Sequence, residues 1–183
     1  MPDFWNDPKT AEQLLKKISS LKSWTNSFEA VKKTYEDLLV MEEFFKTGDA
    51  SEKELDEQFN VCLKLVEKLE FKNMLNKEED KLGAIIAINS GAGGTESQDW
   101  ASMLMRMYIR WGERNNYKYK ILDIQEGEVA GIKSASIEFE GEYAFGYLKG
   151  ENGVHRLVRL SPFDAANKRH TSFASVYAYP VVD

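Results

Sequence analysis

Apolar side chains recur with a helical period through the first 82 residues of the chain. Trp24, Phe28, Val31, Tyr35 and Leu38 follow one another at spacings of four and three residues, so they share one face of a helix. The pattern predicts helices from Pro8 to about Leu21, from Thr25 to about Phe45, and from Ser51 to about Leu75. Two heptad-patterned helices joined by a short turn form an antiparallel hairpin, so we expect a helical hairpin or small bundle in this region.

Polar residues mark the expected helix ends. Asp7 can cap the first helix, and Pro8 fits its first turn, where a backbone N–H has no helical partner to lose. Ser51 and Glu54 have the spacing of a capping box, in which the serine side chain bonds a free backbone N–H and the glutamate reaches back. Cys62 lies on the apolar face and is expected to pack there as a small hydrophobic side chain.

The pattern changes after Leu82, where short runs of β-forming residues alternate with helical segments. The runs predict strands at Ala84–Asn89, Tyr117–Ile124, Ile132–Glu140, Val154–Leu160 and Ser172–Tyr179. The helical segments are Thr95 to about Arg114, which opens on a second capping box at Thr95–Gln98, and Glu142–Leu148. We therefore expect an α+β protein, with a helical domain at residues 1–82 and a mixed α/β domain at residues 83–183.

Composition narrows the classes of function. The 183 residues are 43% hydrophobic and 30% charged, which is typical of a folded protein, and no apolar run approaches the ~20 residues of a membrane-spanning helix. One cysteine and two histidines cannot form an internal disulfide or a histidine-rich metal centre. We therefore expect no metal and no cofactor, and a reducing cytoplasm as the location.

The charge is unevenly distributed along a chain whose net charge is −6. A net-negative chain does not bind nucleic acid through its bulk charge. Between residues 149 and 170, however, cations outnumber carboxylates. These are Lys149, Arg156, Arg159, Lys168 and Arg169 against Glu151 and Asp164. This basic patch predicts either contact with a confined stretch of phosphate or an ordinary solvated face.

The first motif that could carry chemistry is the glycine loop Gly91–Gly94, between an expected strand and an expected helix. Backbone N–H groups at the start of a helix attract anions, so the loop resembles a phosphate cradle. A P-loop needs Lys and then Ser or Thr after its second glycine, but Thr95 and Glu96 follow in this chain. A tight strand-to-helix turn explains the loop better, and a nucleotide-binding enzyme remains an alternative.

The second motif is the segment Val154–Ser172, in which two expected strands flank a polar loop. The loop presents a hydroxyl, an aromatic ring, an imidazole and cations, the groups with which proteins bind single-stranded RNA. An ordinary hairpin whose Phe163 packs inward is the alternative, and composition alone favours it. Ser161, His170 and Asp164 could be drawn as a catalytic set, but no nucleophile-elbow sequence surrounds the serine, so side-chain catalysis is not expected.

Six segments together resemble the bacterial peptide chain release factor 2 family, class I release factors that end translation at UAA and UGA. They are Pro2–Pro8, Gly93–Ala101, Glu126–Ser134, Gly153–Arg159, Ser161–Phe163 and Arg169–Phe173. The segments follow the family's order over nearly the whole chain, so the set is specific. The resemblance implies the ribosome as partner, through its small-subunit decoding site, ribosomal RNA and the mRNA stop codon, for a monomer that binds no membrane.

The resemblance also implies a role for each residue of a codon-recognition site. Ser161-Pro162-Phe163 matches the family's anticodon-like tripeptide, in which Ser161 would bond the second codon base and accept A or G. His170 would stack on that base, while Thr171 would bond the third base. Val158 stands where the UAA- and UAG-reading sister factor carries glutamine, so its apolar side chain would restrict the third base to A.

Backbone and cations complete the implied site. The backbone around Gly93, Gly94 and Glu96 would select uracil as the first base, because glycine allows close approach and a helix start offers free N–H groups. The cations expected to contact RNA phosphate are Arg156, Arg159, Lys168 and Arg169.

The sequence also departs from the family pattern. The family's Gly-Gly-Gln motif, which promotes hydrolysis of peptidyl-tRNA on the ribosome, lies on a separate domain and does not occur in this sequence. Ser90–Gly94 imitates its glycine run, but Thr95 follows. We therefore expect a fragment whose helical domain is N-terminally short, whose codon-recognition domain is C-terminally incomplete, and which is not an enzyme by itself. A release-factor-like rescue or regulatory protein, bound to ribosomes without reading a codon, is the alternative.

Overall fold

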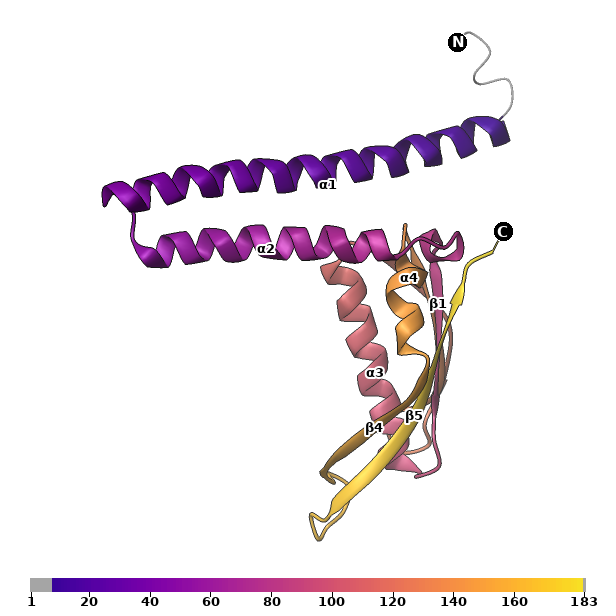
Figure 1. Cartoon of the computed structure of the whole chain (residues 1–183). Helices are drawn as coiled ribbons and strands as arrows, with labels where there is room; N and C mark the ends of the chain where they lie inside the picture. The colour runs from indigo at the N-terminus through magenta and orange to yellow at the C-terminus, as the bar shows by residue number, and fades with distance from the viewer. Residues whose placement is uncertain (1–7, 183) are drawn as a thin grey trace. The chain divides into compact units, whose positions relative to one another are not determined.

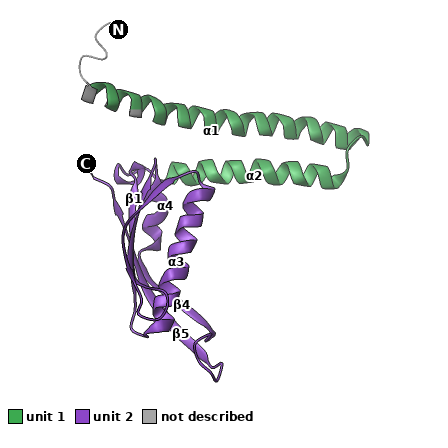
Figure 2. Cartoon of the chain, turned by 180° about the vertical axis from the view of Figure 1, so that it is seen from behind, with its two compact units in different colours: residues 1–74 green, residues 75–183 purple. Residues whose placement is uncertain are grey.

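The computed structural model describes residues 8–182, which divide into two compact units, the first ending at Met74 and the second beginning at Leu75 (Figure 2). The second unit begins ahead of the boundary expected near residue 82, because the segment before its first strand packs within it. The backbone N–H groups of Tyr143 and Phe145 donate to the carbonyls of Lys81 and Leu82, each at 3.1 Å. Among the described residues, no helix is both long and apolar enough to cross a bilayer.

The first unit is an antiparallel pair of helices, α1 (Pro8–Thr47) and α2 (Glu52–Met74). The Lys72 ammonium near the end of α2 donates to the Ser23 hydroxyl at 2.9 Å and lies 4.9 Å from the Trp24 ring centroid. The predicted hairpin is confirmed by this packing. Cys62 is buried on α2, as its place on the apolar face predicted.

The predicted break between Leu21 and Thr25 is wrong, because α1 is one helix of 40 residues. Residues 9–47 contain neither glycine nor proline, so nothing in the backbone stops the helix. Thr25 and Ser27, which could have capped a new helix, instead donate their hydroxyls to the preceding turn. The Ser27 hydroxyl lies 2.7 Å from the Ser23 carbonyl.

A capping box and a glycine fix the helix ends on either side of the turn between α1 and α2. The Ser51 backbone N–H donates to the Glu54 carboxylate at 2.9 Å, and the Glu54 N–H donates to the Ser51 hydroxyl at 3.4 Å, which confirms the capping box. Gly48 has a φ of +85°, a left-handed conformation that glycine adopts without steric cost at the end of a helix. The predicted cap at Asp7 lies outside the described residues.

The second unit is a five-stranded antiparallel sheet covered on one face by a long helix, so the predicted α+β class is confirmed (Figure 1). The sheet order is β2-β3-β1-β5-β4. The strands are β1 (Ala84–Ser90), β2 (Lys118–Glu126), β3 (Ile132–Glu140), β4 (Gly153–Leu160) and β5 (Arg169–Pro180). The helices are α3 (Thr95–Arg114) and the short α4 (Ala144–Leu148), with single 3₁₀ turns η1 (Glu79–Lys81) and η2 (Lys149–Glu151).

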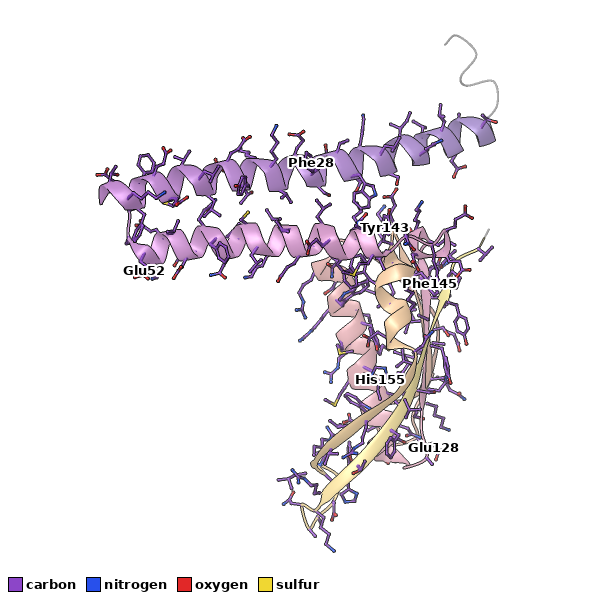
Figure 3. The ribbon with its side chains drawn as sticks, in the orientation of Figure 1. Phe28, Glu52, Glu128, Tyr143, Phe145 and His155 are labelled. Atoms are coloured by element: carbon purple, nitrogen blue, oxygen red, sulfur yellow. The ribbon has the colours of Figure 1, made fainter. Side chains whose placement is uncertain are left out.

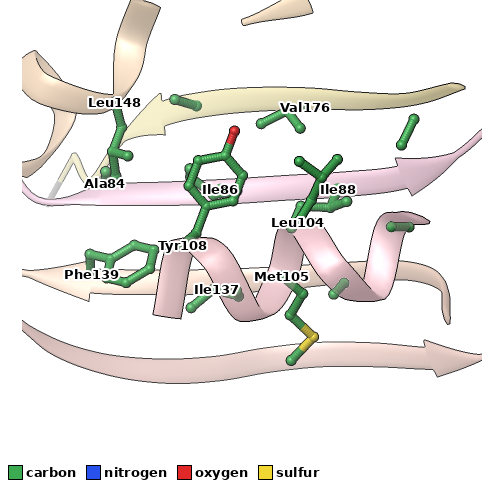
Figure 4. Close-up of a cluster of buried hydrophobic side chains, with 14 of the residues drawn as sticks. Ala84, Ile86, Ile88, Leu104, Met105, Tyr108, Ile137, Phe139, Leu148 and Val176 are labelled. Carbon is green, nitrogen blue, oxygen red and sulfur yellow. The ribbon is translucent and has the colours of Figure 1, made fainter. Parts of the chain in front are cut away.

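The core lies between α3 and the sheet (Figure 4). Leu104 and Tyr108 of α3 point toward β1, where Ile86 and Ile88 are fully buried. Phe139 of β3 closes one end of the core and packs edge-on against Trp111. This apolar layer fixes α3 across the sheet and so fixes where the start of the helix lies.

Asp80 is a buried carboxylate that ties the entry segment to η2. Its side chain is 1% exposed and accepts from the Lys149 ammonium at 2.6 Å. The bond to Lys149 lowers the pKa of the Asp80 carboxyl, and burial raises it. The bond has the larger effect, so the pKa lies below its ordinary value.

We expect Asp80→Ala to lower the free energy of unfolding of the second unit by about 1–3 kcal/mol at neutral pH, because a charged hydrogen bond is lost. Since the folded-state pKa is lowered, the stabilisation is present at neutral pH and is lost as pH falls through that pKa. Urea unfolding at neutral and acidic pH measures both effects. Glu79→Ala, at an exposed neighbour, is the control and should change little.

Candidate nucleic-acid interface

The start of α3 is held against the sheet by the glycine loop that precedes it. The Gly91 N–H donates to the Phe173 carbonyl of β5 at 2.8 Å, and a Cβ at Gly91 would lie 2.6 Å from that oxygen. The Ser97 hydroxyl closes the loop by donating to the carbonyls of Gly91 at 2.7 Å and Gly94 at 2.9 Å. Gly93 and Gly94, both exposed, form the helix tip and have φ values of +150° and +60°.

The predicted capping box at Thr95–Gln98 is wrong. Gly94 occupies the N-cap position of α3, and no side chain caps the start of this helix. The Glu96 carboxylate in the first turn accepts from the Ser161 hydroxyl and from Arg159 at 3.2 Å. Both partners come from the end of β4 and the loop after it, so tertiary contacts hold the first turn of α3.

Arg159 joins the first two turns of α3 to the end of β4. One guanidinium nitrogen lies 2.5 Å from the Asp99 carboxylate and 3.2 Å from that of Glu96. The arginine side chain is 24% exposed, so most of it is packed away from water. Arg159 therefore contacts two internal carboxylates, and its contact with phosphate stays a prediction.

Ser161 is buried, with only 2% of its surface exposed. Its hydroxyl donates to Glu96, and its oxygen accepts from the backbone N–H groups of Phe163 at 3.1 Å and Asp164 at 2.9 Å. A hydroxyl has one donor and two acceptor positions, so all three are used. Ser161 thus fixes the turn of the tripeptide and attaches it to the helix tip.

The rest of the tripeptide is exposed. Pro162 is at the surface, and the Phe163 residue is 45% exposed, so the inward-packed hairpin that composition favoured is wrong. Figure 1 shows β4 and β5 projecting beyond the end of β1, with their connecting loop at the tip. The aromatic ring is therefore available to a partner that approaches this end of the sheet.

The two residues predicted to meet the third codon base are neighbours across two strands. Val158 of β4 and Thr171 of β5 are register partners, and both are exposed. Arg159 and His170 form the next pair along the same ladder. The two members of each pair lie on different strands, and the pairing of β4 with β5 brings them together, with successive pairs on opposite faces of the sheet.

His170 faces Asp164 within the loop, where its Nε2 lies 2.9 Å from the carboxylate. The Ser161 hydroxyl bonds Glu96 rather than this histidine, so the described structure forms no serine–histidine relay. The other histidine, His155, lies along β4, away from the loop (Figure 3). It bonds the Glu151 carbonyl at 2.9 Å, and its own carbonyl accepts from Trp100 at 2.9 Å.

The basic patch is smaller than the sequence suggested. Lys149 pairs with Asp80, and Arg159 pairs with Glu96 and Asp99. The cations that remain exposed, and that form no ion pair within residues 8–182, are Arg156, Lys168 and Arg169. Lys168 and Arg169 lie beside the loop tip, and Arg156 lies on the outer face of β4.

Three features of the site were missed from the sequence. Asp99 lies one helical turn after Glu96, and this spacing was the available signal for a shared partner. Asp164 was considered only as a carboxylate within the basic patch and as part of a catalytic set. Gly131, with a φ of +71°, packs against the backbone of Gln98 and Asp99 so closely that a Cβ there would overlap both residues.

The glycine loop is a poor phosphate cradle. The Gly91 N–H already has a carbonyl partner, and the Glu96 carboxylate in the first turn would repel an anion. A pocket of about 330 Å³ does adjoin α3, but it is lined by Met107, Trp111, Arg114 and Tyr147 from the other half of the helix and from α4. A nucleotide-binding enzyme built on this loop is therefore disfavoured.

The fold and the site define an α+β protein whose candidate interface joins a helix tip to an exposed hairpin loop. The family described as the PCRF domain matches residues 1–176, and the chain belongs to this family. Residues 1–7 of that match lie outside the described structure.

The similarity of the chain to individual proteins is consistent with this family. Peptide chain release factor 2 of Colwellia psychrerythraea is 47% identical over all of this chain and 51% of the relative, and that of a Nitratiruptor species is 49% identical over all of this chain and 50% of the relative. The solved structure of RF2 of Thermus thermophilus is 40% identical, with a TM-score of 0.64 over all of this chain and 51% of that one. The resemblance to the release factor 2 family is confirmed, and the chain spans about half the length of these relatives.

Proposed function

We propose that this chain carries the stop-codon-recognising part of a translation termination factor and reads UAA and UGA in the small-subunit decoding site, in the cytoplasm. The observation that carries the proposal is the bond between Ser161 and Glu96, because it joins the tripeptide loop to the α3 tip as one surface. Three adjacent unpaired bases can be inspected only by groups that are held at fixed spacing.

The first codon base would meet the α3 tip, on one side of the Ser161–Glu96 bond, and the second base would meet Ser161 on the other side. The exposed backbone at Gly93 and Gly94 allows a base to approach without a side chain between them. The Ser161 hydroxyl can donate or accept, so a purine that displaces one of its present bonds finds a partner as either A or G. Phe163 offers a stacking face at the edge of this surface, and a stacked base contributes about 1–3 kcal/mol.

The third base would meet the Val158–Thr171 pair, which offers one hydroxyl and one apolar surface. Valine has no polar group to bond the edge of G, so A is the base expected at this position. Arg156, Lys168 and Arg169 are the phosphate contacts of the proposal, because they are exposed and not neutralised by an internal carboxylate. Arg159 is left out, since its guanidinium holds Glu96 and Asp99.

Ribosome binding as a function of codon tests the proposal. Ribosomes are stalled with UAA, UGA, UAG or a sense codon in the decoding site, and the affinity of the labelled 183-residue chain is measured for each. We expect tighter binding at UAA and UGA than at UAG or the sense codon. Equal binding at all four codons would contradict codon reading and would favour the ribosome-rescue or regulatory alternative.

The same ribosomes, loaded with labelled peptidyl-tRNA, report on hydrolysis. The sequence has no Gly-Gly-Gln, so we expect this chain to bind without releasing peptide. Release above the background rate would show that another part of the chain promotes hydrolysis. A thermal-shift measurement with ATP and GTP addresses the nucleotide-binding alternative, for which stabilisation is the expected sign.

Single substitutions should separate the second and third bases. Ser161→Ala removes the bond to Glu96 together with the edge hydrogen bond, so it is expected to reduce discrimination by at least about 1–2 kcal/mol, most strongly at the second base. Thr171→Val should act at the third base by a similar amount and spare the second. The measurement is the affinity of each variant for ribosomes carrying single-base changes of UAA. Loss at the same base in both variants would contradict the assignment of the two residues.

A further inference from the structure

We propose that Asp164 is a positioning residue for His170, and that its carboxylate fixes both the tautomer of the imidazole and the shape of the loop that carries it. The role in codon reading rests on the proposed function, whereas the effect on the tautomer does not. No feature of the sequence pattern assigned this carboxylate a task of its own.

The two carboxylate oxygens of Asp164 hold different groups. Oδ2 lies 2.9 Å from Nε2 of His170, and Oδ1 accepts from the Ala166 backbone N–H at 2.8 Å. The Asp164 carbonyl accepts from the Asn167 N–H at 2.9 Å, in a turn where Asn167 has a φ of +48°. One side chain therefore folds the loop and anchors the ring at its end.

Asp164 is itself fixed to the helix tip. Its backbone N–H donates to the Ser161 hydroxyl oxygen at 2.9 Å, and that hydroxyl donates to Glu96. The Ser161 N–H donates to the Lys168 carbonyl at 3.0 Å, which closes the base of the loop. The position of the imidazole relative to α3 is thus set by a continuous chain of bonds through Asp164.

The contact determines where the imidazole carries its proton. A carboxylate only accepts, so Nε2 must donate, whether the ring is neutral or protonated. The bond to His170 is also the first cause that holds the pKa of the Asp164 carboxyl below its ordinary value, so this group is ionised at neutral pH. A neutral ring then leaves Nδ1 as an acceptor, which suits an RNA donor such as an exocyclic amine or a 2′-hydroxyl.

Asp164→Asn is the informative substitution because it should reverse this arrangement. The amide oxygen is needed by the Ala166 N–H, so the amide NH₂ would face the imidazole, and Nε2 would have to accept. We expect the His170 proton to move to Nδ1 in the variant. The ¹⁵N signals of the two ring nitrogens report the tautomer in the 183-residue chain, and His170→Gln assigns them.

The effect on function is measured with the codon-programmed ribosomes. We expect Asp164→Asn to lower affinity at UAA and UGA roughly tenfold, the scale of one charge-assisted hydrogen bond. Asp123→Asn makes the same chemical change on an exposed residue of β2 and should alter neither the tautomer nor the affinity.

The outcomes distinguish the control of the His170 tautomer by Asp164 from the role of this contact in codon reading. A proton on Nδ1 in the unmodified chain, or an unchanged tautomer in Asp164→Asn, would overturn the proposal. A reversed tautomer with unaltered codon affinity would overturn the positioning role. If the unmodified chain binds all codons equally while its tautomer reverses in Asp164→Asn, the proposed function fails and the control of His170 by Asp164 stands.

Discussion

Replacing Arg159 by methionine is expected to destabilise the second unit by about 3 kcal/mol and to abolish codon discrimination. Methionine fills much of the same space but leaves Glu96 and Asp99 without the cation that both contact. Removing one partner of a buried ion pair costs about 3–5 kcal/mol. The lower end of this range applies because the side chains of Arg159 and Asp99 are 24% and 25% exposed. Urea unfolding measures the loss.

The functional loss should exceed what instability explains. Without Arg159, the two neighbouring carboxylates repel, so Glu96 is expected to turn toward water and release the Ser161 hydroxyl. The helix tip and the tripeptide loop would then move independently, and affinity for UAA and UGA should fall to the value for a sense codon even where the variant is fully folded.

Arg156 supplies the matched control for this substitution. It lies on the same strand, but on the exposed face, and it forms no ion pair among the described residues. Arg156→Met should leave stability within about 0.5 kcal/mol and lower affinity at every codon equally, since a phosphate contact carries no base information. Equal effects of the two substitutions on stability and on discrimination would contradict the role of Arg159 as the link between β4 and the helix tip.

Local sequence pattern was sufficient to predict most of the scaffold. The strand Ile132–Glu140 and the helix Thr95–Arg114 have the predicted bounds, because alternation and helical period are properties of neighbouring residues. The same rules failed within α1, where Thr25 was interpreted as the start of a second helix. The hydroxyl of Thr25 can bond backward as well as cap, and the sequence does not show which it does.

The site could be predicted only in part, for a different reason. The Thr95–Gln98 segment matches a capping box, yet Gly94 occupies the N-cap position, and the neighbouring Glu96 bonds Ser161, a residue 65 positions along the chain. No local rule predicts the bond between Glu96 and a distant hydroxyl, because that bond depends on how β4 is paired. The motif resemblance correctly indicated the family, while the burial of Ser161 and the engagement of Arg159 emerged only from tertiary contacts.

Gly131→Ala is expected to produce the other large effect, although Gly131 contributes no side chain to the interface. The residue has a φ of +71°, and an added Cβ would overlap the Gln98 carbonyl group and the Asp99 nitrogen at the start of α3. A left-handed alanine costs about 1 kcal/mol and overpacking costs about 1–3 kcal/mol, so a loss near 3 kcal/mol is expected.

Alanine variants of two other glycines separate the cost of the left-handed backbone from the cost of overpacking. Gly48 has a φ of +85° with open space around it, so Gly48→Ala should cost only the backbone share, about 1 kcal/mol. Gly150 has open space and no left-handed φ, so its alanine variant should be neutral. Urea unfolding of the three variants provides the comparison.

The position of Gly131 makes its substitution informative about recognition as well. The backbone that an added Cβ would displace includes Asp99, whose carboxylate holds Arg159 at 2.5 Å. If the α3 tip is positioned from both sides, by Arg159 on β4 and by the glycine turn before β3, Gly131→Ala should reduce discrimination at the first and second codon bases together. Retained discrimination in a folded Gly131→Ala variant would show that the contact with β4 alone positions the tip.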